Sequence, residues 1–166
     1  TMNDIIFLPM RLQPMHIGHL ELISEASKLG KKTVILIFNS KTRDKNNPLL
    51  ESEKIKILKK TIELEKLSNI QIISMPYFEN SNQRFEFVNN NIKLTKNSLV
   101  ISGNDFIINS FSKLGYKINT PEEILGELID ITGTKLRDLI KQEKQFRHHL
   151  SSGTLHYLEE LNFLNN

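Results

Sequence analysis

Short apolar runs recur along the chain, and each is followed by a segment with apolar residues three or four positions apart. The runs cover residues 5–8, 33–38, 70–75, 98–102 and 116–118. The run from Thr33 to Phe38 is almost continuously apolar, which is typical of a strand buried on both faces of a parallel sheet. The repeated order of strand and helix predicts an α/β fold, with a doubly wound, Rossmann-like sheet of five parallel strands flanked by helices.

The helices are predicted from the spacing of their apolar residues and from the residues at their ends. The expected helices cover residues 20–29, 52–67, 84–94, 105–114 and 132–141, with a C-terminal helix at about 151–162. Gly30 is expected to stop the first helix and Ser52 to cap the second. Residues 119–131 are expected to form a loop. No linker or repeat divides the sequence, so we expect one domain over residues 1–166.

The segment from Pro9 to His19 joins the first predicted strand to the first predicted helix. In an open α/β sheet, such a loop lies at the carboxyl ends of the strands, where ligands bind. His16 and His19 flank Gly18, which has no Cβ and lets a nucleotide approach the backbone. The unpaired N–H groups at a helix start attract anions. Two histidines at this spacing are also common at a polar helix start, but this position favours a phosphate site.

A second candidate phosphate site lies near the C-terminus. Thr132, Gly133 and Thr134 open a predicted helix, where backbone N–H groups and hydroxyls are available to a phosphate. Arg137 follows one turn later, and its guanidinium can reach the same oxygens. The alternative is a helix cap followed by a surface arginine.

Composition narrows the class of protein. The chain has 166 residues, 22 of them basic and 19 acidic, and its net charge of +3 is too small to indicate a nucleic-acid surface. The absence of cysteine excludes disulfides, thiolate metal sites and a cysteine nucleophile. No apolar run is long enough to span a membrane, and the first residues do not resemble a signal peptide. We therefore expect a cytoplasmic protein that binds a small polyanion.

The motif Arg11-x-Gln13-Pro14-x-His16-x-Gly18-His19 resembles the His-x-Gly-His signature of a nucleotidyltransferase superfamily, which class I aminoacyl-tRNA synthetases share. It is most similar to the archaeal-type nicotinamide mononucleotide (NMN) adenylyltransferases. Met10 stands where that family has glycine, and Met15 where it has phenylalanine. The segment from Thr132 to Arg137 resembles the second signature of the superfamily, Ser-Ser/Gly-Thr-x-x-Arg.

Further segments resemble the same enzymes. The run Asn47-Pro48-Leu49-Leu50-x-x-Glu53 is similar to their Asn-Pro-Phe-Thr-x-x-Glu/Arg. Several members have an arginine just before this run, where this chain has Asn46. Lys45 or Arg43 could take the place of that arginine. Ser102-Gly103-Asn104 is similar to the Ser-Gly-Asn that lies against adenosine. The chain has no tryptophan to stack on the acceptor base. Either Phe85 or Phe87 could stack on that base instead, and Tyr77 and Phe78 just before them are further aromatic candidates. The alternative is that Phe85 and Phe87 belong to the apolar core.

The resemblance implies that AMP is transferred from ATP to nicotinamide mononucleotide. The residues implied as catalytic are His16, His19, Arg11 and Arg137. Those implied to bind ATP or its phosphates are Met10, Gln13, Gly18, Gly103, Asn104, Thr132, Gly133 and Thr134. Those implied to bind the acceptor are Asn82, Phe85 and Phe87. The resemblance also implies a Mg²⁺ ion, held through substrate and water more than through protein, and a homo-oligomer.

The sequence leaves two alternative functions open. One is another transferase of the superfamily, which passes AMP or CMP to a different phosphorylated acceptor such as phosphopantetheine or glycerol phosphate. The Arg-x-Gln-Pro sequence at Arg11 favours the nicotinamide branch over the Thr-Phe-Asp form of those enzymes. The other is a nucleotide sensor that keeps the fold without turnover, against which His16, His19 and Arg137 argue. The length and weak basic charge exclude an aminoacyl-tRNA synthetase.

Overall fold

The computed structural model describes residues 2–126. In this part of the chain the strands are β1 (Asn3–Met10), β2 (Gly30–Phe38), β3 (Ile70–Met75), β4 (Ser98–Ile101) and β5 (Lys117–Asn119). They form one five-stranded sheet in the order β3-β2-β1-β4-β5, and every neighbouring pair is parallel. The predicted sheet is confirmed. The predicted helices at 132–141 and 151–162, and the candidate residues Thr132, Gly133, Thr134 and Arg137, lie outside the described residues.

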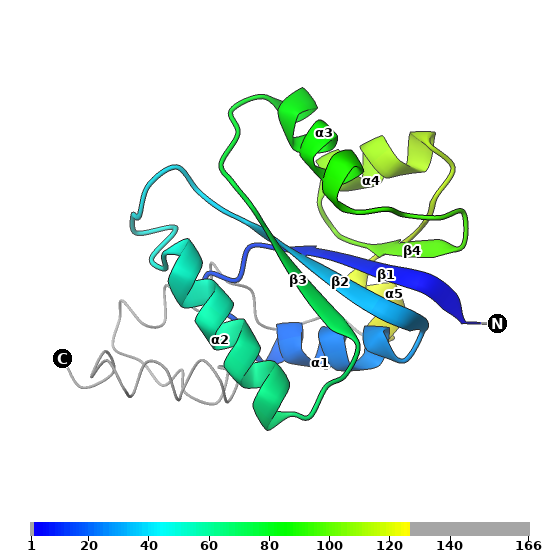
Figure 1. Ribbon diagram of the computed structural model, residues 1–166, viewed down its shortest axis with the longest axis horizontal. Helices are drawn as coiled ribbons and strands as arrows, with labels where there is room; N and C mark the ends of the chain where they lie inside the picture. Colours follow the sequence, from blue (N-terminus) through cyan, green and yellow to red (C-terminus); the bar gives the residue numbers. More distant parts are fainter. Residues whose placement is uncertain (1, 127–166) are drawn as a thin grey trace.

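Helices pack on both faces of the sheet (Figure 1). They are α1 (Ile17–Ser27), α2 (Glu51–Leu64), α3 (Ser81–Asn91), α4 (Asp105–Lys113) and α5 (Pro121–Leu125). Helices α1 and α2 cover one face, and α3 and α4 cover the other. Ile124 and Leu125 of α5 pack into the same apolar cluster as α1. The sheet is therefore the middle layer of three.

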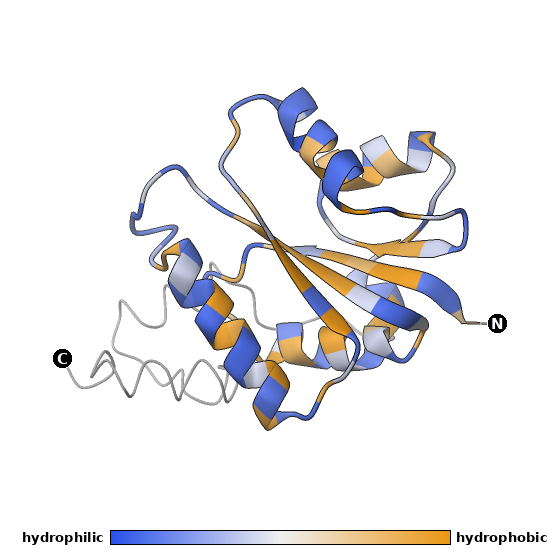
Figure 2. Cartoon of the chain, viewed as in Figure 1, coloured by the Kyte–Doolittle hydropathy of each residue, from blue (hydrophilic) through white to orange (hydrophobic). Residues whose placement is uncertain are grey.

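The central strands are buried on both faces because each face has its own apolar cluster. On β1, Ile6 and Leu8 point into the cluster under α1 and α2, whereas Phe7 points into the cluster under α3 and α4. On β2, Ile35 likewise belongs to the first cluster and Leu36 to the second. Figure 2 shows apolar residues concentrated along these strands, while the helices alternate between apolar and polar positions. This two-sided burial explains the continuous apolar runs of the sequence.

The prediction that Gly30 stops the first helix is wrong. Helix α1 ends at Ser27 with Lys28 as its C-cap, and Gly30 is the first residue of β2. A Cβ at Gly30 would lie 2.6 Å from Cγ1 of Ile6. The glycine is therefore needed for the close approach of β2 to β1.

Ser52 does not cap α2, which is also a correction. The N-cap is Leu50, whose backbone N–H donates to Oε1 of Glu53 over 2.8 Å. The Glu53 carboxylate thus accepts the hydrogen bond from the N-cap N–H of the helix. Ser52 is exposed in the first turn. Helix α3 begins and ends three residues earlier than predicted, and α5 lies inside the predicted loop.

The strand order places a topological switch point beside β1. From β1 the chain proceeds to β2 and β3 on one side of the sheet, and then returns to β4 and β5 on the other. In open α/β sheets, ligands bind at such a point, outside the carboxyl ends of the strands. The loop after β1 and the turn after β4 therefore meet where a ligand is expected. No helix in the described part of the chain has the length and apolarity needed to cross a membrane.

Candidate nucleotide site

The two histidines of the first motif cap helix α1 reciprocally. His16 is the N-cap, and its Nδ1 accepts a hydrogen bond from the backbone N–H of His19 at 3.4 Å. In return, Nδ1 of His19 accepts from the backbone N–H of His16 at 3.1 Å. The two rings stack with centroids 3.7 Å apart and an interplanar angle of 25°. The two histidines thus form a mutually hydrogen-bonded, stacked pair at the start of α1, where the phosphate site is predicted.

This arrangement fixes how the imidazoles present protons. Because Nδ1 is the acceptor in both rings, each neutral ring carries its proton on Nε2. Burial, followed by the charge of the neighbouring His16, holds the pKa of His19 well below 6.5. His19 is therefore neutral at pH 7 and offers an N–H donor rather than a positive charge.

Arg11, at the carboxyl end of β1, is oriented by the loop after β2. Its Nη2 donates to Oδ1 of Asn47 at 2.7 Å and to the carbonyl of Asn46 at 3.2 Å. Asp44 organises this loop, because its Oδ1 accepts the backbone N–H groups of Asn46 and Asn47, both at 2.8 Å. The bond from the Asn46 N–H is the main reason that the pKa of Asp44 is lowered. Arg11 therefore presents a positioned guanidinium in the loop region where phosphate binding is predicted.

Gln13 is buried, and its amide holds the same loop. Nε2 donates to the carbonyl of Leu49 at 3.0 Å, and the backbone N–H of Leu49 donates to Oε1 at 2.9 Å. The structure thus shows Gln13 positioning the loop that orients Arg11. The side chain of Met10 is buried in the apolar cluster beneath α1 and α2. A contact of either residue with ATP stays a prediction.

A buried lysine that the sequence did not single out joins the ends of two strands. Nζ of Lys54, on α2, donates to the carbonyl of Phe38 at 2.6 Å and to the carbonyl of Arg11 at 3.1 Å. Burial, and then the charge of Arg11, lower the pKa of Lys54 to about 8, while Glu51 acts in the opposite direction. A lysine in an amphipathic helix ordinarily indicates a solvent-facing position, so no local signal marked it.

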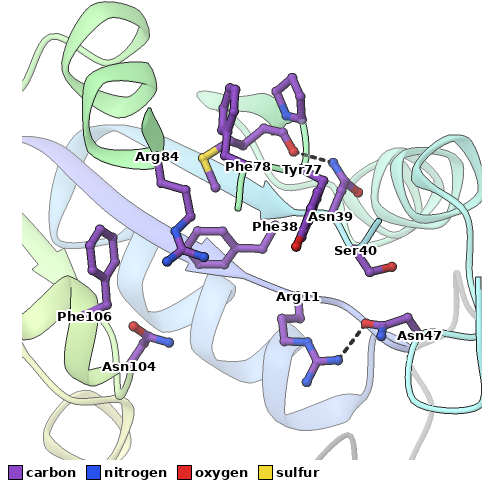
Figure 3. A pocket seen from close by; sticks show the side chains of 12 residues that line it. Arg11, Phe38, Asn39, Ser40, Asn47, Tyr77, Phe78, Arg84, Asn104 and Phe106 are labelled. Carbon is purple, nitrogen blue, oxygen red and sulfur yellow. Dashed lines mark hydrogen bonds between the residues drawn. The ribbon is translucent and has the colours of Figure 1, made fainter. Parts of the chain in front are cut away.

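A pocket with a volume of about 320 Å³ lies at the carboxyl ends of the strands (Figure 3). It is lined by Arg11, Phe38, Asn39, Ser40, Asn47, Met75, Pro76, Tyr77, Phe78, Arg84, Asn104 and Phe106. Arg11 and Asn47 lie at a polar end, and the rest of the lining combines aromatic rings with polar side chains such as those of Arg84 and Asn104. A flat base joined to a sugar phosphate has this distribution of apolar and charged groups.

Of the other residues predicted to bind ATP, Asn104 lines the pocket, whereas Gly18 and Gly103 do not. Asn104 lines the pocket and caps α4, its Oδ1 accepting the N–H of Ile107 at 3.2 Å. Gly18 is buried in the first turn of α1, and Gly103 is exposed just before Asn104.

The predicted acceptor residues on α3 do not line this pocket. Asn82 is exposed. The ring of Phe85 lies 6.0 Å from that of Phe111, and the ring of Phe87 lies 5.9 Å from that of Phe78. Both phenylalanines thus lie in aromatic clusters, and their contact with a base stays a prediction. Phe38 and Phe106 line the pocket, although the sequence motifs did not identify them as site residues. Phe38 could have been found from its position at the carboxyl end of a parallel strand, where ligands bind.

A comparison with protein families agrees with this geometry. The family model of cytidylyltransferase-like proteins matches residues 11–152, which include the histidine pair and most of the chain. The chain belongs to the cytidylyltransferase-like family. The resemblance stated from the sequence motifs is thereby confirmed.

Individual relatives extend the comparison. The nicotinamide-nucleotide adenylyltransferase of Methanococcus aeolicus is 26% identical over 157 residues, which are 91% of this chain and 86% of that protein. The protein of the same name from Methanococcus maripaludis strain C5 is 27% identical over 161 residues, 96% of this chain and 91% of that one. The structure of a bifunctional NMN adenylyltransferase/ADP ribose pyrophosphatase from Francisella tularensis, which is 19% identical and covers 99% of this chain, has a similar fold, with a TM-score of 0.75. The chain spans half the length of that bifunctional protein.

Proposed function

We propose that this cytidylyltransferase-like chain is an adenylyltransferase that transfers AMP from ATP to nicotinamide mononucleotide, giving NAD and pyrophosphate. The observation that carries the proposal is the reciprocally capped pair of His16 and His19 at the switch point of the sheet. Archaeal relatives that carry this activity in their names match more than nine tenths of the chain. The pocket beside Arg11, whose lining combines aromatic rings with polar side chains, supports a nucleotide acceptor.

The geometry suits phosphate transfer without a covalent intermediate on the protein. An oxygen of the acceptor phosphate attacks the α-phosphorus of ATP, the bond to the bridging oxygen breaks, and pyrophosphate leaves. The Nε2–H groups of His16 and His19 would donate to the oxygens on which charge accumulates, and Arg11 would bind phosphate oxygens as a cation. Because His19 is neutral at pH 7 and its Nδ1 already accepts from the His16 N–H, its Nε2–H would donate a hydrogen bond rather than a proton.

A magnesium ion bound through the substrate is compatible with the described residues. Residues 2–126 contain no group of three or more His, Cys, Asp or Glu side chains that could hold a metal ion. Mg²⁺ would supply charge neutralisation on the phosphates while coordinated by their oxygens and by water. The homo-oligomer and the cytoplasmic location also stay predictions.

The test is product formation from defined substrates. The chain is incubated with ATP, Mg²⁺ and nicotinamide mononucleotide, and NAD is measured by its reduction with alcohol dehydrogenase. Parallel reactions replace ATP by CTP, or the acceptor by phosphopantetheine or glycerol phosphate, and pyrophosphate release is measured in each. NAD formation that His19→Ala slows about 100-fold supports the proposal. Pyrophosphate release with a different acceptor alone would refute the substrate, and its absence with every pair would refute the reaction class.

A further inference from the structure

Arg84 is a cation in the pocket without an anionic partner. It lies on α3, and its buried Nε has no hydrogen-bond partner. Within residues 2–126, no ion pair involves Arg84. Its guanidinium carbon lies 5.2 Å from the centroid of the Phe106 ring. Figure 3 shows the side chain reaching into the pocket, with Phe106 on one side of it in this view and Phe38 and Tyr77 on the other.

An unpaired cation among aromatic rings favours a ligand that brings an acceptor. Burial of a charged donor without a partner is unfavourable, and the ring of Phe106 compensates only part of that cost. A carboxylate on the ligand would supply two acceptor oxygens and the missing negative charge, which suits the planar fork of an arginine. The arrangement therefore points to an anionic group at the aromatic end of the pocket.

This anionic group is distinct from the acceptor phosphate. The phosphate has its own candidate partner in Arg11, at the polar end of the pocket, where Asn47 orients the guanidinium. Arg84 instead lies beside the rings that suit a flat base. The group that Arg84 meets is therefore a substituent on that base.

Resting on the proposed function, we infer that Arg84 selects the acceptor by its ring substituent and makes the enzyme prefer the mononucleotide of nicotinic acid, which carries a carboxylate, over that of nicotinamide. A pyridinium ring is itself positively charged, so a carboxamide leaves two like charges facing each other. The carboxylate cancels the ring charge and pairs with Arg84. Both acceptors react through the same phosphate, so the selection concerns the base alone.

The experiment measures kcat/KM for both mononucleotides with ATP, in the whole chain. We expect the wild type to favour the carboxylate substrate, and Arg84→Gln to lower its preference about tenfold, or about 1.4 kcal/mol, by removing one charge-assisted pair. Arg84→Lys keeps the charge and should retain part of the preference. Lys93→Gln removes an equal charge from an exposed position just beyond α3 and should leave the preference unchanged. The KM for ATP should be the same in all four proteins.

Other outcomes overturn the inference. Equal losses with both mononucleotides in Arg84→Gln would place Arg84 on the shared ribose phosphate. A wild-type preference for the carboxamide would point instead to Asn39, whose buried Oδ1 has no hydrogen-bond partner and could accept an amide N–H. Either result leaves the proposed function intact, because NAD still forms. Failure of both mononucleotides as acceptors would instead refute the proposed function.

Discussion

Replacing Lys54 by methionine tests how the ends of β1 and β2 are held together. Lys54 is 2% exposed, and its ammonium donates to the carbonyls of Arg11 and Phe38. Methionine has a similar length and fills the same space without a charge or a donor. The substitution therefore removes the desolvation cost of the ammonium, and at the same time leaves both carbonyls without this partner.

The two effects oppose each other at pH 7. The pKa of Lys54 falls from 10.5 to about 8, which corresponds to about 3 kcal/mol of unfavourable free energy at about 1.36 kcal/mol per pH unit. Each carbonyl that loses its donor costs about 1–3 kcal/mol. We therefore expect Lys54→Met to change the free energy of unfolding at pH 7 by no more than about 3 kcal/mol.

The dependence on pH separates these effects. The folded protein releases the Lys54 proton near pH 8, whereas the unfolded chain holds it up to 10.5. Between these values the unfolded state binds more protons, so the free energy of unfolding of the wild type rises with pH. Urea denaturation at pH 7 and pH 10 should show a gain of about 2.5 kcal/mol for the wild type relative to Lys54→Met.

A control on the same helix makes the result specific. Lys59 is exposed on α2, and Lys59→Met should follow the wild type at every pH. Other titrating groups contribute equally to all three proteins and cancel in the comparison. If the difference between wild type and Lys54→Met were the same at pH 7 and pH 10, the desolvated ammonium would be refuted as the cause.

Three further substitutions test the site and the sheet. His19→Ala should lower kcat by about 100-fold with little change in the KM for ATP, because its hydrogen bond strengthens in the transition state; near-normal turnover would refute this role. Gln13→Ala should destabilise the fold by about 2–4 kcal/mol in urea denaturation, because the buried N–H and C=O of Leu49 lose their partners. Gly30→Val should lower the melting temperature, since its Cβ would lie 2.6 Å from Ile6; an unchanged melting temperature would contradict that close contact.

Local patterns accounted for most of the sheet and for the centre of the site. The run from Val34 to Phe38 reads as a buried strand because its residues face the two apolar clusters in turn. The pair of His16 and His19 could be located because a strand, a glycine-containing turn and a helix follow one another directly. The end of α1 was misplaced because Gly30 also has a tertiary reason to be glycine, which local rules do not contain.

The hydrogen bonds that hold the loops of the candidate site join residues that are distant in the sequence. Gln13 bonds to Leu49, 36 positions away, and Lys54 to the carbonyl of Arg11, 43 positions away. Neither side chain differs locally from an ordinary loop glutamine or helix lysine. Likewise, Arg84 meets the aromatic residues of the pocket only because the strand order brings α3 to the same edge of the sheet.

The sequence by itself determined the α/β class, the parallel sheet and the position of the helix start that carries His16 and His19, because periodicity and turn chemistry act over a few neighbouring residues. The tertiary structure alone decided the neutral state of His19, the buried charge of Lys54 and the place of Arg84 beside Phe106. Burial and the distances between charges control such properties, and both arise only when separate segments pack together.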